Sequence, residues 1–233
     1  MRSIARIAAF VLLLTACSTP PSTEPETSVK PGINQDYLAD DLDVARFENR
    51  FEVESREVFT QRAKILAACG LRTGMHVADI GAGTGLFTLL MASRLGETAK
   101  VYAVDIAPKF IEHIEQRAAE RKLGNIRGVV CGERDVNLPP ACIDLAFVCD
   151  TYHHFEYPMS TLATIHAALR PGGELVIVDF IREPGQSRQW ILDHVRAGRD
   201  VVRQEIEAAG FTFVRQEPTP FLQENYLLRF VRS

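Results

Sequence analysis

Short apolar segments alternate with longer amphipathic ones from residue 70 onward, and this alternation restricts the fold more than any other feature of the sequence. We expect strands at 76–80, 101–105, 126–131, 143–150, 175–178, 211–214 and 226–231. We expect helices at 86–95, 108–122, 157–169 and 188–209, and one or two more between 37 and 66. Buried strands separated by helices indicate a mostly parallel sheet that is covered on both faces. The prediction is an α/β protein with a doubly wound seven-stranded sheet and N-terminal helices.

The N-terminus has the composition of an export signal. Arg2 and Arg6 precede an apolar run at 7–14, which is too short to span a bilayer. The run ends in Leu-Thr-Ala-Cys-Ser at 14–18, which resembles the lipobox of bacterial lipoproteins. This resemblance implies that residues 1–16 are a signal peptide and that Cys17 is lipidated. A signal with an incidental cysteine, or a wrongly chosen start codon, is the alternative.

The residues after Cys17 differ from the rest of the chain. Four of the 12 prolines lie between 18 and 36, where apolar residues are few, so we expect 17–36 to be a flexible tether and 37–233 to be the globular domain. By the lipoprotein resemblance, Ser18 favours the outer membrane, with the protein facing the periplasm. The net charge of −4 argues against a nucleic-acid partner.

The glycine-rich segment 77–85, Val-Ala-Asp-Ile-Gly-Ala-Gly-Thr-Gly, joins the first strand of the domain to a helix. Glycines at such a turn let the backbone approach a ligand closely. The spacing is not the Gly-x-Gly-x-x-Gly of dinucleotide sites. The carboxylate of Asp79, two residues before the first glycine, disfavours a pyrophosphate and suits a cationic ligand.

The chain at this point resembles class I S-adenosylmethionine-dependent methyltransferases, over roughly residues 45–233. Four segments carry the resemblance in order: 79–85, the strand 101–106, the strand and loop 143–155, and Leu-Arg-Pro-Gly-Gly-Glu-Leu at 169–175. The resemblance implies that S-adenosylmethionine is the cofactor. It places Asp105 on the ribose hydroxyls and Ile106 against the adenine, and it assigns the cofactor-binding turn to Asp79, Gly81, Ala82, Gly83, Thr84 and Gly85.

Further site residues are expected in the loops at the carboxyl ends of the strands. For the loop after the third strand we prefer Asp135 to Glu133 as the partner of the adenine amine. Arg56, from the N-terminal helices, is expected to pair with the carboxylate of the cofactor. Asp150 is assigned to the cofactor site.

The residues after Asp150 are candidates for catalysis, because the methyl group would point toward them. They are Tyr152, His153 and His154. Histidine titrates near neutral pH and can accept the proton of a nucleophile. Since adjacent side chains diverge, we prefer His153 to His154. His194 could line a lid but is expected to be a packed residue.

The predicted function is methyl transfer to an O, N or C nucleophile of a small molecule. The alternative is a non-catalytic lipoprotein that retains the fold and binds a cofactor or ligand, since S-adenosylmethionine is made in the cytosol. The cysteines show neither a Cys-x-x-Cys pair nor metal-ligand spacing, so no metal is expected. The oligomeric state cannot be predicted.

Overall fold

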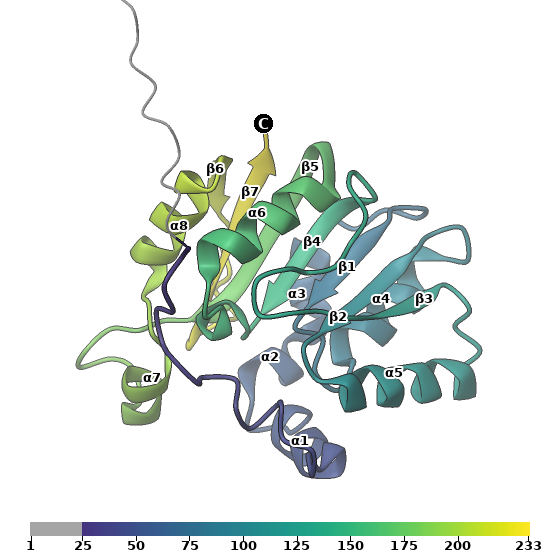
Figure 1. The fold of residues 1–233 in the computed structure, drawn as a ribbon, viewed down its shortest axis with the longest axis horizontal. Helices are drawn as coiled ribbons and strands as arrows, with labels where there is room; N and C mark the ends of the chain where they lie inside the picture. Colours follow the sequence, from purple (N-terminus) through teal and green to yellow (C-terminus); the bar gives the residue numbers. More distant parts are fainter. Residues whose placement is uncertain (1–24) are drawn as a thin grey trace, which may run out of the picture.

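The strands form one seven-stranded sheet in the order β3-β2-β1-β4-β5-β7-β6 (Figure 1). The structure is a computed structural model and describes residues 25–233. The first five strands are parallel, and β7 pairs antiparallel with both β5 and β6. Their bounds are β1 Val77–Ile80, β2 Val101–Asp105, β3 Ile126–Val130, β4 Ile143–Cys149, β5 Leu169–Phe180, β6 Phe211–Gln216 and β7 Asn225–Arg232. The predicted fold class is confirmed.

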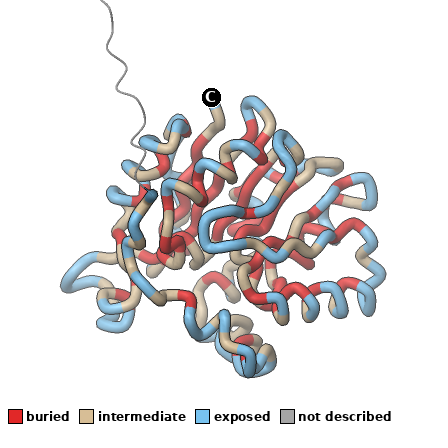
Figure 2. Tube along the Cα trace, in the orientation of Figure 1, coloured by how far each residue is buried: buried red, intermediate tan, exposed pale blue. Residues whose placement is uncertain are grey.

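Helices cover both faces of the sheet. On one face, α3 (Arg62–Ala68), α4 (Leu86–Leu95) and α5 (Pro108–Glu120) bury apolar side chains against it. On the other face lie α6 (Pro158–Ala168) and α8 (Arg199–Ala208). The inner strands β1, β2, β4 and β7 are mostly buried, whereas the edge strands β3 and β6 are partly exposed (Figure 2); buried inner strands are expected of a doubly wound sheet. No helix among the described residues is long and apolar enough to cross a membrane.

The N-terminal helices are shorter than the sequence suggests. Instead of one or two helices, the structure has α1 (Val44–Phe51), α2 (Glu57–Thr60) and α3. The carboxylate of Asp43 caps α1 by accepting from two backbone N–H groups. These breaks bring the loop around Arg56 over the carboxyl ends of the strands.

The helix predicted at 188–209 is wrong, because it is two helices, α7 (Gln189–His194) and α8. Arg182 explains the break: its guanidinium donates to the carbonyl oxygens of Val195 at 2.7 Å and Leu192 at 2.9 Å. These carbonyls then no longer need donors from a continuing helix. The break places α7 beside the cavity described below.

The predicted flexible tether must be shortened at its C-terminal end. The carboxylate of Glu26 accepts from the backbone N–H groups of Met159 at 2.8 Å and Ser160 at 2.7 Å, at the start of α6. Val29 N–H donates to the carbonyl of Glu156 at 3.0 Å. Residues 26–34 thus lie along the domain and lead toward α1 (Figure 1). Cys17 and the predicted signal peptide lie outside the described residues.

Candidate cofactor and acceptor site

A cavity of about 390 Å³ opens at the carboxyl ends of β1, β2 and β4. This is the edge of the sheet where ligands bind in open α/β folds, and the volume is in the range of small-molecule sites. The β1–α4 turn forms one part of its wall, and the loop before α2 forms another. Further parts of the wall come from the segments after β3 and β4, from α1, α5 and α7, from the end of β5 and the start of β7, and from Asn34 and Tyr37.

The β1–α4 turn depends on glycines with left-handed backbone. Gly81 has φ +73°, and a Cβ there would lie 2.1 Å from Thr151 Cγ2. Gly85 has φ +87°, and a Cβ there would lie 2.7 Å from Ile114 Cγ1 on α5. Gly81 and Gly83 line the cavity, whereas Gly85 does not. Gly85, predicted to bind the cofactor, therefore serves close packing between the turn and α5.

Asp105 lies where the sequence predicts, at the end of β2 and in the cavity wall. Its carboxylate accepts from the backbone N–H groups of Gly83 at 2.8 Å and Ala107 at 2.9 Å. Burial raises the pKa of Asp105 to about 6, although these bonds lower it. The carboxylate thus joins β2 to the glycine turn.

Asp79 is a second buried carboxyl in the same wall. It accepts from Thr88 Oγ1 at 2.6 Å, and burial raises its pKa to about 7. Buried carboxyls that lack a cation are poor at holding negative charge. A ligand that carries positive charge would stabilise the ionised forms of Asp79 and Asp105.

The other predicted cofactor residues divide between the cavity and the surface. Ala82, Thr84 and Ile106 line the cavity, and the Thr84 hydroxyl donates to Glu52 at 2.8 Å. Asp135 is exposed, does not line the cavity and accepts from the backbone of Asn137. Of the two acids considered for this loop, Glu133 is the one in the cavity wall. The preference for Asp135 is not supported, because the loop turns its side chain back on itself.

Arg56 and Asp150 both line the cavity, and they form an ion pair with each other. The second carboxylate oxygen of Asp150 accepts from Asn225 Nδ2 at 2.6 Å. Burial raises the pKa of Asp150 to about 6, and Arg56 opposes this rise. Arg56 is thus placed at the cavity as predicted, but its partner within the protein is a carboxylate at the end of β4.

Tyr152, predicted to be catalytic, does not line the cavity. It begins the 3-10 helix η1 (Tyr152–His154), is fully buried, and donates its hydroxyl to Glu205 on α8 at 2.7 Å. Burial, together with the charge of Glu205, raises its pKa. The side chain joins η1 to α8.

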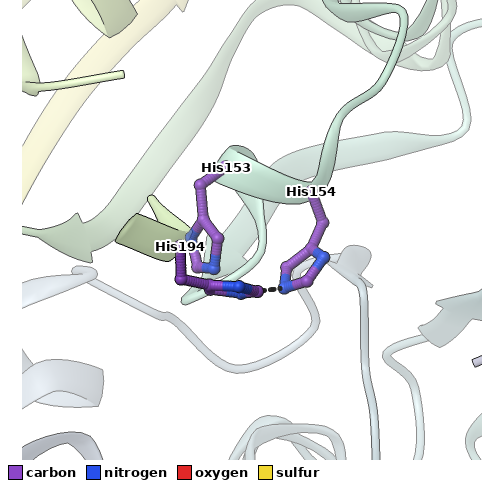
Figure 3. Close-up of side chains that lie close together, drawn as sticks. All are labelled: His153, His154 and His194. Carbon is purple, nitrogen blue, oxygen red and sulfur yellow. Dashed lines mark hydrogen bonds between the residues drawn. The ribbon is translucent and has the colours of Figure 1, made fainter. Parts of the chain in front are cut away.

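His153 and His154 both line the cavity, so the expectation that only one of them faces it is wrong. Their ring centroids lie 4.4 Å apart, and those of His154 and His194 lie 5.0 Å apart (Figure 3). His194, expected to be a packed residue, comes from α7 and lines the same cavity. Burial lowers the pKa of His154 to about 2 and that of His194 to about 4, so both imidazoles are neutral near pH 7.

Sequence reasoning missed Asp179, near the end of β5. Its Oδ1 lies 2.8 Å from His153 Nδ1, and its Oδ2 accepts from the backbone N–H of His153 at 3.1 Å. An acid after the apolar run 175–178, at the same edge as Asp105 and Asp150, is the signal that could have identified it. No local signal identifies His194, which lies 40 residues from His154.

Comparison with known proteins agrees with this arrangement. Residues 78–177 match the family model of a methyltransferase domain. The match covers 100 of the 233 residues of the chain. Residues 78–177 contain β2 to β4 and most of β1 and β5. They also contain the β1–α4 turn, Asp79, Asp105 and the histidine pair of η1.

Relatives and solved structures extend the likeness. A ubiquinone/menaquinone biosynthesis C-methyltransferase of Hydrogenovibrio crunogenus is 28% identical over 112 residues, which cover 48% of this chain and 44% of the relative. A malonyl-[acyl-carrier protein] O-methyltransferase of a Paenibacillus species is 31% identical over 116 residues, covering 48% and 41%. This chain thus spans less than half of either relative. A methyltransferase structure from Aquifex aeolicus is 23% identical to this chain and superposes with a TM-score of 0.72. The match covers 82% of this chain and 99% of the Aquifex chain, so the likeness in fold extends beyond residues 78–177.

Proposed function

We propose that this protein is an S-adenosylmethionine-dependent methyltransferase that acts on a small molecule. The observation that carries the proposal is the buried carboxylate of Asp105, which faces the cavity and is bonded to the glycine turn. It lies within the residues that match the methyltransferase family model. The same region of the relatives belongs to methyltransferases of small or carrier-bound acceptors.

The residues of the cavity fit the cofactor. S-adenosylmethionine, when bound, supplies a methyl group on a positively charged sulfonium. Asp105 retains lone pairs for ribose hydroxyls, because the N–H groups of Gly83 and Ala107 bond different oxygens of the carboxylate. Gly81 and Gly83 line the cavity with backbone that carries no side chain. Asp79 adds the negative charge that an ammonium and a sulfonium favour.

The histidines mark the end of the cavity where we place the acceptor. Asp179 holds Nδ1 of His153, which leaves the lone pair of Nε2 free when Nδ1 carries the proton. An imidazole in this state can take a proton from the acceptor or bind a metal ion, and the positions of His154 and His194 favour the second. The relatives include a C- and an O-methyltransferase, and we propose a small-molecule acceptor without choosing the atom.

Calorimetry of the full chain with S-adenosylmethionine and S-adenosylhomocysteine tests cofactor binding. Asp105→Asn should weaken binding by about 10- to 100-fold, because charge-assisted hydrogen bonds to the ribose become neutral ones. Asp135→Asn is the matched control and should leave affinity unchanged, since Asp135 lies outside the cavity. Absence of binding to the folded wild-type chain would contradict the proposal. Binding without turnover of any acceptor in a broad panel would favour the non-catalytic alternative.

We also propose that Cys17 is lipidated and anchors the protein in the bacterial envelope, at the outer membrane facing the periplasm. The support is the order of basic residues, apolar run and lipobox-like segment at 2–18. Mass spectrometry of the N-terminal peptide from native membranes should detect an acylated Cys17. Cys17→Ser should release the protein from the membrane fraction. An N-terminus that retains residues 1–16 would contradict this proposal.

A further inference from the structure

His153, His154 and His194 have the spacing of a metal ligand set (Figure 3). One ring nitrogen from each lies within 4.8 Å of the other two. Nε2 of His154 and Nε2 of His194 are 3.2 Å apart. Two nitrogens on one tetrahedral ion, each at 2.0–2.1 Å from it, lie about 3.3–3.4 Å apart. This pair thus already has the separation that a shared ion requires, and a ring nitrogen of His153 lies within 4.8 Å of both.

Asp179 orients the third ligand. Its Oδ1 accepts from His153 Nδ1 and from the backbone N–H of Phe180, while its Oδ2 accepts from the backbone N–H of His153. Because these bonds fix the carboxylate on both sides, the His153 ring is held with Nε2 facing away from Asp179. Metal-ligating histidines usually make this carboxylate contact through their other nitrogen. Asp179 is therefore a positioning residue for the site.

The N-terminal segment fixes the backbones of the other two ligands. Lys30 Nζ donates to the carbonyl oxygen of His194 at 2.6 Å, and Asn34 Nδ2 donates to that of His154 at 3.2 Å. Through one segment these contacts connect η1 and α7, whose residues His154 and His194 lie 40 positions apart in the sequence. Tyr37 packs edge-on against the ring of His154, with centroids 5.2 Å apart. The ligand set is thus held in place before any ion binds.

The facing Nε2 atoms of His154 and His194 are hydrogen-bond partners of each other in the apoprotein. The short contact between the imidazoles of His154 and His194 uses one proton for two nitrogens. A metal ion that replaced this proton would take a lone pair from both nitrogens.

We propose that His153, His154 and His194 bind one divalent transition metal ion of the zinc class, with an open coordination position toward the cavity. Three imidazoles suit zinc, cobalt, nickel or copper, whereas magnesium and calcium prefer oxygen ligands. Sites with three protein ligands and a fourth open position are typical of catalytic zinc. The open position would hold an oxygen or nitrogen of the acceptor. This last role rests on the proposed methyl transfer, but metal binding itself does not.

Metal binding can be measured directly on the full chain. The purified protein is stripped with a chelator, dialysed, and titrated with Co²⁺ and Zn²⁺, with elemental analysis of the bound metal. We expect one equivalent per chain and the visible bands of four- or five-coordinate Co²⁺, which Zn²⁺ should displace. His153→Gln and His194→Gln should each weaken binding by more than about 100-fold, beyond the 10- to 100-fold loss expected for the positioning variant Asp179→Asn. His166→Gln, on the outer helix α6, is the matched control and should bind like wild type.

Calorimetry with S-adenosylmethionine on the same samples separates this proposal from the methyltransferase proposal. A folded wild-type chain that binds the cofactor but takes up no Co²⁺ or Zn²⁺ would overturn the metal site alone. Stoichiometric metal that persists in the His153→Gln, His194→Gln double variant would also overturn it, because the ion would then lie elsewhere. Metal bound through the histidines without cofactor binding would support the site and contradict the proposed function. Circular dichroism of each variant establishes that it is folded.

Discussion

Thr88 on α4 provides the hydrogen bond to the buried carboxyl of Asp79, and its removal gives a quantitative test of the site. Thr88 is 0% exposed and Asp79 3% exposed, and the hydroxyl lies 2.6 Å from the carboxyl oxygen. Thr88→Val keeps the branched shape but removes the donor. The carboxyl is then left without its side-chain partner in a place that water cannot easily reach. We expect a loss of stability whose size depends on pH.

The size of the loss follows from the titration of Asp79. Burial raises its pKa from 3.8 to about 7, so between these values the folded state binds a proton that the unfolded state has lost. Stability from this group is therefore present below pH 3.8 and is lost as pH rises toward 7. Above that, Asp79 is ionised, and the missing hydrogen bond is a charge-assisted one of about 1.5–3 kcal/mol. At pH 5 the carboxyl is protonated, and the loss is about 1 kcal/mol.

These free energies convert into melting temperatures at about 2–4 °C per kcal/mol for a domain of this size. Thr88→Val should therefore lower Tm by roughly 3–12 °C at pH 8 and by about 2–4 °C at pH 5. Thermal melts of the ligand-free protein at both pH values measure this difference. Thr88→Ser is the control, because it keeps the hydroxyl and loses only a methyl group. An equal loss at both pH values, or a serine variant that behaves like valine, would refute the reasoning.

Three further predictions concern packing, Tyr152 and the cofactor. Gly85→Ala should destabilise the protein by about 2–4 kcal/mol in urea unfolding, because its left-handed backbone and the crowding by α5 both oppose a methyl group. Gly70→Ala, with φ +69° and open space around it, should cost only the backbone part, about 1–2 kcal/mol. Tyr152→Phe removes the hydrogen bond to Glu205 and should lower stability by about 1 kcal/mol. Turnover should stay within about twofold of wild type, and a large loss of kcat would restore the predicted catalytic role. Affinity for the cationic cofactor should rise between pH 5 and pH 8, because Asp105 and Asp79 ionise in this range. Calorimetry would detect proton release on binding, and an affinity that does not change with pH would contradict the role of these carboxylates.

The parts of the site that the sequence predicts are those whose determinants lie close together in the chain. Asp79 and the glycines of the turn occupy a few consecutive residues, and a strand, a turn and a helix start follow from them directly. Asp105 follows from the apolar strand that it ends. The placement of these residues at one edge is a consequence of parallel topology, so it too could be predicted.

The parts that could not be predicted depend on contacts between distant segments. The helix at 188–209 has a continuous apolar stripe, and only the guanidinium of Arg182 shows why it is interrupted. Tyr152 differs from His153 in direction because Glu205 on α8 accepts its hydroxyl. His194 reaches the cavity only because α7 is separated from α8. Spacing along the chain contains none of this information.

The contacts of residues 26–34 have a mechanical consequence. Lys30 and Asn34 attach this segment to the backbones of His194 and His154. In the protein anchored at Cys17 that we propose, only nine chain steps separate the lipid from Glu26, a reach of about 30 Å when fully extended. The domain would then be kept within about its own diameter of the bilayer. A pulling force on the chain between Cys17 and Glu26 would act on residues 26–34, which contact the backbones of His154 and His194, before it acted on the sheet. The membrane could therefore influence the acceptor end of the cavity through the backbone alone.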